Sequence, residues 1–183
     1  MAKPPPPPPD PVYTIPLTDD ELIVLGRITA VWAHVEFALD KILVAVHGID
    51  HGQLGLFVGD KQIGAKAAMF RQSLPRITDA GARGLALAAC EAVSAAIGDR
   101  NLAAHGMWGF DVHHETRTTT AAAYSMQKHV GLFPSRRLPD LYKRVVAASA
   151  AIDAAQLAVE GRPPEPRRNR KFLFGKGPPP DWL

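Results

Sequence analysis

The feature that most constrains the fold is a single apolar stripe in the first third of the chain. Its members, which recur at alternating steps of three and four residues, are Leu25, Ile28, Trp32, Val35, Leu39, Ile42 and Val46. This spacing places them on one face of an α-helix. Thr18, with Glu21 three residues later, matches a capping box, and Gly48 follows the last apolar residue. We therefore expect one long amphipathic helix from about residue 18 to Gly48, which needs other helices to cover its apolar face.

Three further segments supply those partner helices. The spacing of apolar residues predicts helices over about 55–74, 79–105 and 138–160. Pro75 lies just past the first of these and Gly161 just past the last, where each ends a helix. The predicted fold is mainly α, an up-and-down bundle of about four helices.

A short β-hairpin is expected between the last two helices. The runs near 107–113 and 118–127 are rich in aromatic and β-branched residues, with polar residues between them. The hairpin is thus inserted directly before the last helix.

The two ends of the chain differ from this domain, which we place at 18–161. Residues 1–17 include six consecutive prolines, Pro4 to Pro9, which exclude helix and sheet and predict a disordered, extended segment. Residues 162–183 form a basic, proline-rich tail. From 161 to 183 there are six basic and two acidic residues, a net +4 against +3 for the whole chain.

The basic tail is a candidate RNA-binding segment. Its basic residues lie beside Phe172 and Phe174, and the candidates are Arg167, Arg168, Arg170 and Lys171. Arginines can meet phosphates while aromatic rings stack on bases. One alternative is a solvated, solubilising end, and another is a tail that packs its phenylalanines onto the domain or onto a second subunit.

Composition points to a cytoplasmic protein. The single cysteine, Cys90, excludes an internal disulfide and fits a reducing compartment, where it serves as a small packing residue. We expect no membrane span, because no run of about 18 uninterrupted apolar residues exists, and the N-terminus lacks the apolar segment of a secretory signal.

Polar residues of functional interest gather where the 79–105 helix ends. Arg100 continues the apolar stripe of that helix, and Asn101 and His105 follow. Asn101 and His105 lie about 40° apart on one helical face, and the long Arg100 side chain can curl round the last turn to join them. Gly106 lets the chain turn away, and Trp108 can then wall the site.

These residue types suit phosphate chemistry. A guanidinium binds phosphate through two parallel hydrogen bonds, a histidine transfers protons near neutral pH, and an amide can orient either group. Arg100 could stabilise a charged phosphorane while His105 deprotonates a 2′-hydroxyl or protonates the leaving oxygen, with no cofactor. The structural alternative is that Arg100 caps helix carbonyls, or is sealed against Glu36, and that His105 hydrogen-bonds within the bundle.

The stretch "RNLAAHG" resembles the R-x4-6-H motif of the HEPN family (higher eukaryotes and prokaryotes nucleotide-binding domains), with Arg100, Asn101 and His105 at the motif positions. "RITAVWAHVEFALDKIL" is similar to the first helix of bacterial HEPN-like proteins, and this resemblance makes Glu36 a candidate partner for Arg100 or His105. The resemblance to the family extends over roughly residues 19–160. The hairpin directly after the motif is a departure from the family pattern.

The resemblance implies a metal-independent endoribonuclease that acts as a homodimer, with the two motifs facing each other. Toxin–antitoxin, phage-defence and RNA-processing roles are typical of such proteins, and an antitoxin protein is then a partner. Other members are non-catalytic and bind RNA, a nucleotide or a protein. His113, His114 and Glu115, near Asp111, could recruit a metal, but no second cluster has zinc-like spacing, so we expect no metal site.

Overall fold

The computed structural model describes residues 15–58, 62–125 and 132–163, and the fold is mainly helical. The principal helices and strands are, in chain order, α1 (Asp19–His47), α2 (His51–Val58), α3 (Ile63–Ser73), α4 (Ala80–His105), β1 (Met107–His113), β2 (Thr118–Tyr124), β3 (Leu132–Pro134) and α5 (Leu138–Val159). Short 3-10 turns at Leu74–Arg76 and Ser135–Arg137 precede α4 and α5. The segment predicted to be disordered, 1–17, lies outside these ranges except for residues 15–17. The predicted basic tail, 162–183, lies outside them except for residues 162–163.

Helix α1 begins and ends where the sequence predicts. The Thr18 side chain accepts a hydrogen bond from the Glu21 backbone, and the Glu21 carboxylate accepts one from the Thr18 backbone at 2.9 Å. This reciprocal pair satisfies N–H groups that an open helix end leaves free. At the other end Gly48 adopts a left-handed conformation, with φ 62°, which glycine reaches without steric cost.

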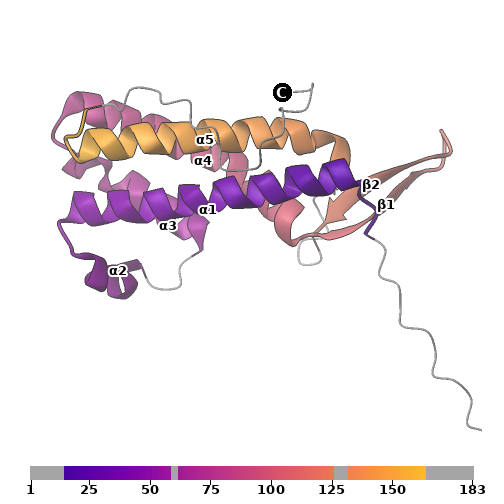
Figure 1. Ribbon diagram of the computed structural model, residues 1–183, viewed down its shortest axis with the longest axis horizontal. Coiled ribbons are helices and arrows are strands. Elements are labelled where there is room, and N and C mark those ends of the chain that lie inside the picture. Colours follow the sequence, from indigo (N-terminus) through magenta and orange to yellow (C-terminus); the bar gives the residue numbers. More distant parts are fainter. Residues whose placement is uncertain (1–14, 59–61, 126–131, 164–183) are drawn as a thin grey trace, which may run out of the picture.

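Four helices form the bundle, and the predicted up-and-down architecture is confirmed. Helix α5 packs against both α1 and α4, while α3 covers part of α1 and α4. Figure 1 shows α1 and α5 running side by side along the longest axis of the molecule. The fully buried large side chains of the core include Trp32, Phe70, Phe133, Ile28, Leu39, Ile42, Leu138, Leu141 and Ile152.

Small residues on α4 allow this close packing. Ala86, Ala89, Cys90 and Val93 are all buried against the neighbouring helices. Burial raises the pKa of the Cys90 thiol to about 11, so this cysteine stays protonated and unreactive at neutral pH. The prediction that Cys90 is a packing residue is confirmed.

The predicted helix over 55–74 is wrong as a single element. The chain forms α2 and α3 instead, and α3 begins at Ile63 after an extended Gln62. Gly55, Gly59 and Gly64 lie in or beside this region, and glycine is a poor helix former. The apolar residues Ile63, Ala67 and Phe70 are buried as expected, because the periodic pattern belongs to α3 alone.

The predicted hairpin is confirmed, and a third strand extends it into a sheet. β1 pairs antiparallel with β2, and β2 pairs antiparallel with β3. β2 ends at Tyr124, short of the expected residue 127. In Figure 1 the β1–β2 hairpin extends beyond the end of the helical bundle, while Phe133 of β3 is buried in the core.

By length and composition alone, α1 and α4 are two helices of the described chain that could cross a membrane. Both contribute buried residues to the bundle core, and the core helix of a soluble protein meets the same criterion. The expectation of no membrane span therefore stays a prediction.

Candidate functional site

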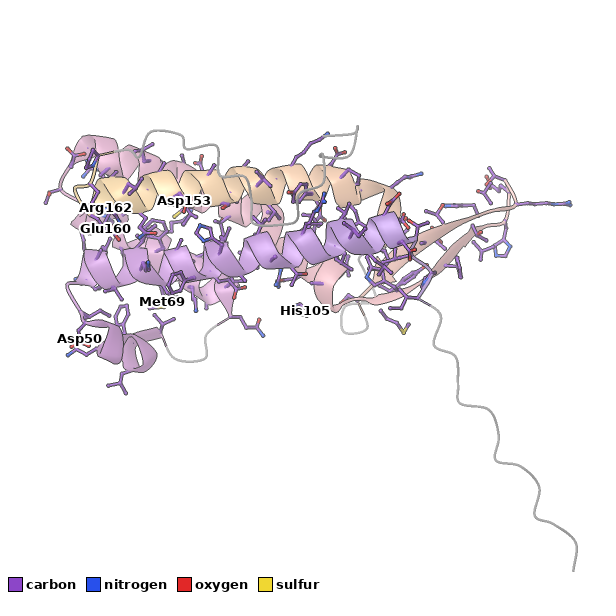
Figure 2. The ribbon with its side chains drawn as sticks, in the orientation of Figure 1. Asp50, Met69, His105, Asp153, Glu160 and Arg162 are labelled. Atoms are coloured by element: carbon purple, nitrogen blue, oxygen red, sulfur yellow. The ribbon has the colours of Figure 1, made fainter. Side chains whose placement is uncertain are left out.

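The three polar residues at the end of α4 meet. Arg100 Nη1 lies 3.1 Å from His105 Nε2, and it donates a 3.2 Å hydrogen bond to Asn101 Oδ1. His105 is exposed, whereas Arg100 and Asn101 are half-buried. Figure 2 labels His105 at the end of α4, beside the start of the sheet. One guanidinium nitrogen thus holds both other groups of the motif.

The Arg100–His105 contact fixes which histidine nitrogen carries the proton. A guanidinium nitrogen can only donate a hydrogen bond, so Nε2 of His105 must accept one. The proton of the neutral imidazole then lies on Nδ1. In this tautomer Nε2 is the nitrogen that can accept a proton, as a general base must.

Arg100 has an aromatic support that the sequence analysis missed. The centre of its guanidinium lies 5.5 Å from the ring centroid of Trp32, which is fully buried in α1. Such a contact attracts a cation to the face of the ring. The sequence assigns Trp32 to the core stripe and Arg100 to a different helix. Helical periodicity alone therefore carried no signal for their contact.

Burial acts against the charge of Arg100. Desolvation lowers the pKa of the guanidinium, and the carboxylate charge of Glu36 opposes that effect. Nε of Arg100 is buried and has no hydrogen bond to any residue in the described ranges. Arginine nevertheless stays protonated in proteins, so the site holds a partly desolvated positive charge.

Glu36 supports Arg100 from a distance. It is half-buried, and among the described residues it forms no ion pair with Arg100. The arrangement therefore differs from the structural alternative in which Arg100 is sealed against Glu36.

Trp108 lies away from the Arg100 group and anchors the sheet. Its indole N–H donates to the Ala103 carbonyl at 3.0 Å, and its ring meets Phe133 edge to face, with centroids 6.4 Å apart. The described contacts of Trp108 are structural, and none joins it to Arg100 or His105. The aromatic ring beside Arg100 is therefore that of Trp32 on α1, and not that of Trp108.

Gly106 is required where α4 gives way to β1, for a reason other than an unusual φ angle. Its φ is −71°, open to any residue. A Cβ at this position would clash with the Leu102 carbonyl oxygen, and it would lie 3.0 Å from the Tyr124 carbonyl oxygen and 3.1 Å from Cβ of Ala123. Glycine therefore lets the sheet approach the helix end that carries His105.

Gly106→Ala is expected to lower the free energy of unfolding by about 1–3 kcal/mol, the usual cost of overpacking, because the opposing atoms belong largely to the backbone. Urea denaturation followed by circular dichroism measures this. The matched control is Gly84→Ala in the same helix, where a Cβ meets nothing within 4 Å. That variant should gain up to about 1 kcal/mol, and equal stability of the two variants would contradict the packing argument.

A second cluster of charged side chains, around Asp99, lies next to Arg100 on α4. The sequence analysis did not predict it. Asp99 Oδ2 accepts hydrogen bonds from Arg144 Nη2 at 2.6 Å and from Arg137 Nη2 at 2.8 Å. Arg144 also donates to the Ala95 carbonyl at 2.9 Å. Asp99 and Arg100 are adjacent in sequence, but their side chains lie on different faces of α4 and meet different neighbours.

Arg167, Arg168, Arg170 and Lys171 lie outside the described residues. Within the described ranges no group of three or more histidine, cysteine, aspartate or glutamate side chains is arranged to hold a metal. His113 Nε2 lies 3.4 Å from Asp111 Oδ2 on β1, which accounts for two members of the weak metal motif.

Comparison of the chain with models of known protein families, with curated proteins and with solved structures found no significant match.

Proposed function

We propose that this protein is a metal-independent endoribonuclease of the HEPN type. The observation that supports the proposal best is the 3.1 Å contact between Arg100 Nη1 and His105 Nε2 at the exposed end of α4. It pairs a phosphate-binding cation with an unprotonated imidazole nitrogen. The resemblance of "RNLAAHG" to the R-x4-6-H motif points to the same chemistry.

In the proposed reaction His105 is the general base and Arg100 binds the scissile phosphate. Nε2 of His105 takes the proton of the ribose 2′-hydroxyl, and the 2′-oxygen forms a bond to phosphorus. The bond from phosphorus to the 5′-oxygen breaks, and that oxygen takes a proton from water. The products are a 2′,3′-cyclic phosphate and a 5′-hydroxyl end.

Arg100 and Asn101 prepare this step. Both hydrogen bonds described for the Arg100 side chain use Nη1. Nη2 can therefore meet a phosphate oxygen, and the phosphate can draw Nη1 away from His105. The developing negative charge of the phosphorane is stabilised more strongly by a partly desolvated cation than by one in bulk water. Asn101 keeps the guanidinium near His105 through its 3.2 Å hydrogen bond.

The test is a cleavage assay with end-labelled RNA in the presence of EDTA. Cleavage should persist without free metal and leave a 2′,3′-cyclic phosphate. The same RNA with a 2′-deoxy or 2′-O-methyl sugar at each cleavage site should resist, because the attacking hydroxyl is missing. Cleavage of the 2′-deoxy strand, or loss of all activity in EDTA, would overturn the proposed mechanism.

The proposal includes a homodimer, and an exposed apolar face of α1 supports it. Ile23, Ala30 and Phe37 recur every seven residues on that helix and are all exposed, with Phe37 at 56%. Residues seven apart lie on one helical face. Such a stripe on a helix surface suits packing against a second copy of the helix.

Phe37→Asp is expected to shift the protein from dimer to monomer, because a carboxylate in an apolar contact loses its hydration. Light scattering after size-exclusion chromatography measures the mass of each variant. Leu56→Asp is the matched control, since Leu56 is an equally apolar residue that is 90% exposed on α2. A Phe37→Asp protein with the mass of the wild type would contradict a dimer through this face.

A non-catalytic module that binds RNA, a nucleotide or a protein such as an antitoxin is the second candidate. The observation that favours it is that the unprotonated nitrogen of His105 already accepts a hydrogen bond from Arg100. If His105 keeps this hydrogen bond, its nitrogen cannot take a proton from the substrate, and the protein would bind RNA without cleaving it. Binding of RNA with no product after long incubation would support this candidate against the ribonuclease.

A further inference from the structure

We propose that Arg137 and Arg144, held around Asp99 on the other flank of α4, form a second phosphate subsite for the same RNA strand. The inference rests on the proposed ribonuclease function, and it adds a binding site for a phosphate neighbouring the scissile one. The ligand is a phosphodiester of a single-stranded RNA.

The charges of this cluster favour an anion. Two guanidinium groups share one carboxylate oxygen, so one positive charge is left over. Arg136 is exposed beside them, and Lys143 is paired with Asp140 at 3.4 Å. Counting these four basic and two acidic side chains, the flank has a net charge of about +2, which attracts phosphate.

The guanidinium groups are presented to solvent in a fixed position. The Arg137 side chain is 48% exposed, and its guanidinium lies 5.3 Å from the ring centroid of the buried Phe133. The Arg144 side chain is 36% exposed and fixed by both Asp99 and the Ala95 carbonyl. A preorganised guanidinium loses less rotamer entropy when it binds a phosphate than a free surface arginine does.

Helical geometry places the two subsites on opposite flanks of α4. Asp99 meets arginines on the α5 side and Asn101 accepts a hydrogen bond from Arg100. The two residues are two positions apart in sequence and thus lie about 160° from each other around the axis. The face of α4 between them carries the exposed small residues Ala95 and Gly98 and the half-buried Leu102, and a Cβ on Gly98 would meet nothing within 4 Å. A helix with its side chains is about 10–12 Å across, a span that a short extended piece of RNA can cross.

The two arginines also have a structural role, and the test must separate it from RNA binding. Arg137→Gln is suitable because Asp99 keeps its bond to Arg144, so no carboxylate is left without a partner. A half-exposed ion pair contributes little to folding, and the variant should remain folded. Arg71→Gln is the matched control, with the same charge change at an exposed position on α3.

The experiment measures RNA affinity in the His105→Ala background, where cleavage is removed, by fluorescence anisotropy across a range of salt concentrations. Arg137→Gln should weaken binding of a single-stranded hexanucleotide about tenfold, as expected for a lost charge-assisted hydrogen bond. The slope of log affinity against log salt should become shallower by about 0.7, the value for one phosphate contact on a single strand. Arg71→Gln should change neither quantity.

Strand length provides the second readout. A dinucleotide has a single phosphodiester, and we expect that group to bind at Arg100. Arg137→Gln should therefore leave the affinity of the protein for the dinucleotide unchanged. In the catalytically active protein the variant should raise KM for long RNA with kcat unchanged.

The outcomes distinguish the two proposals. If the hexanucleotide binds the His105→Ala protein but Arg137→Gln leaves the salt slope unchanged, or weakens the dinucleotide equally, the second subsite is wrong and the proposed function stands. If neither RNA binds the protein, the proposed function fails and the subsite fails with it.

Discussion

His105→Ala is expected to abolish RNA cleavage while the protein keeps its fold. General acid–base catalysis by a positioned side chain contributes about 10²–10⁴-fold to a rate, and the variant removes the base. His105 is exposed, and the contact described for its side chain is with Arg100. The loss should therefore appear in kcat, measured with end-labelled RNA in EDTA, with the thermal unfolding midpoint close to that of the wild type.

The matched control for this prediction is His113→Ala. His113 is also an exposed histidine near the same end of the molecule, and it contacts Asp111 on its own strand. Its removal should leave cleavage within about twofold of the wild type, since surface changes away from a site have small effects. Cleavage by His105→Ala at the wild-type rate would remove His105 from the mechanism and favour the binding module.

The parts of the fold that were predicted correctly are those with a local physical cause. The capping box of Thr18 and Glu21, the left-handed Gly48 and the apolar stripe between them all act within one helix, so the sequence contains the whole signal. The hairpin is also local, because two adjacent runs with β-forming residues pair with each other. The convergence of Arg100, Asn101 and His105 followed in the same way from one helical turn and a long side chain.

The errors and omissions depend on contacts between distant segments. Strand β3 is three residues long, and its place depends on burying Phe133 beside Trp108, which no local pattern reveals. Trp108 was expected at the site because it follows His105 closely in sequence. The register of the sheet pairs it with Ala123 and places its ring on Phe133 instead.

The charged contacts around α4 illustrate the same limit. Asp99 and Arg100 are neighbours in sequence, yet one binds arginines from the α5 side of the bundle and the other lies over a tryptophan of α1. The packing of α4 against both α1 and α5 decides this division. Helical spacing placed Arg100 on the apolar stripe of its helix but gave no indication of which aromatic ring would lie beneath it.

Trp32→Ala is expected to be the most destabilising substitution in the site. The Trp32 side chain is fully buried, and removing a buried tryptophan costs about 3–5 kcal/mol, a large part of the 5–15 kcal/mol that stabilises a typical domain. Urea denaturation should show this loss. Partial unfolding would itself reduce cleavage, so the alanine variant measures only what Trp32 contributes to folding. Milder substitutions are needed to test whether Trp32 also positions Arg100.

Trp32→Phe and Trp32→Leu separate that role from packing. Both side chains are smaller than tryptophan and both are apolar, but only phenylalanine presents a π face to the Arg100 guanidinium, 5.5 Å from the present ring. Both variants also remove an indole N–H that has no hydrogen bond to any described residue, so its loss does not distinguish them. A cation–π contact contributes about 0.5–2 kcal/mol, so at equal folded fraction Trp32→Leu should cleave RNA roughly 2- to 30-fold more slowly than Trp32→Phe. Equal rates for the two variants would show that the ring fills the core without positioning Arg100. The guanidinium would then be held in position by Asn101 and His105 alone.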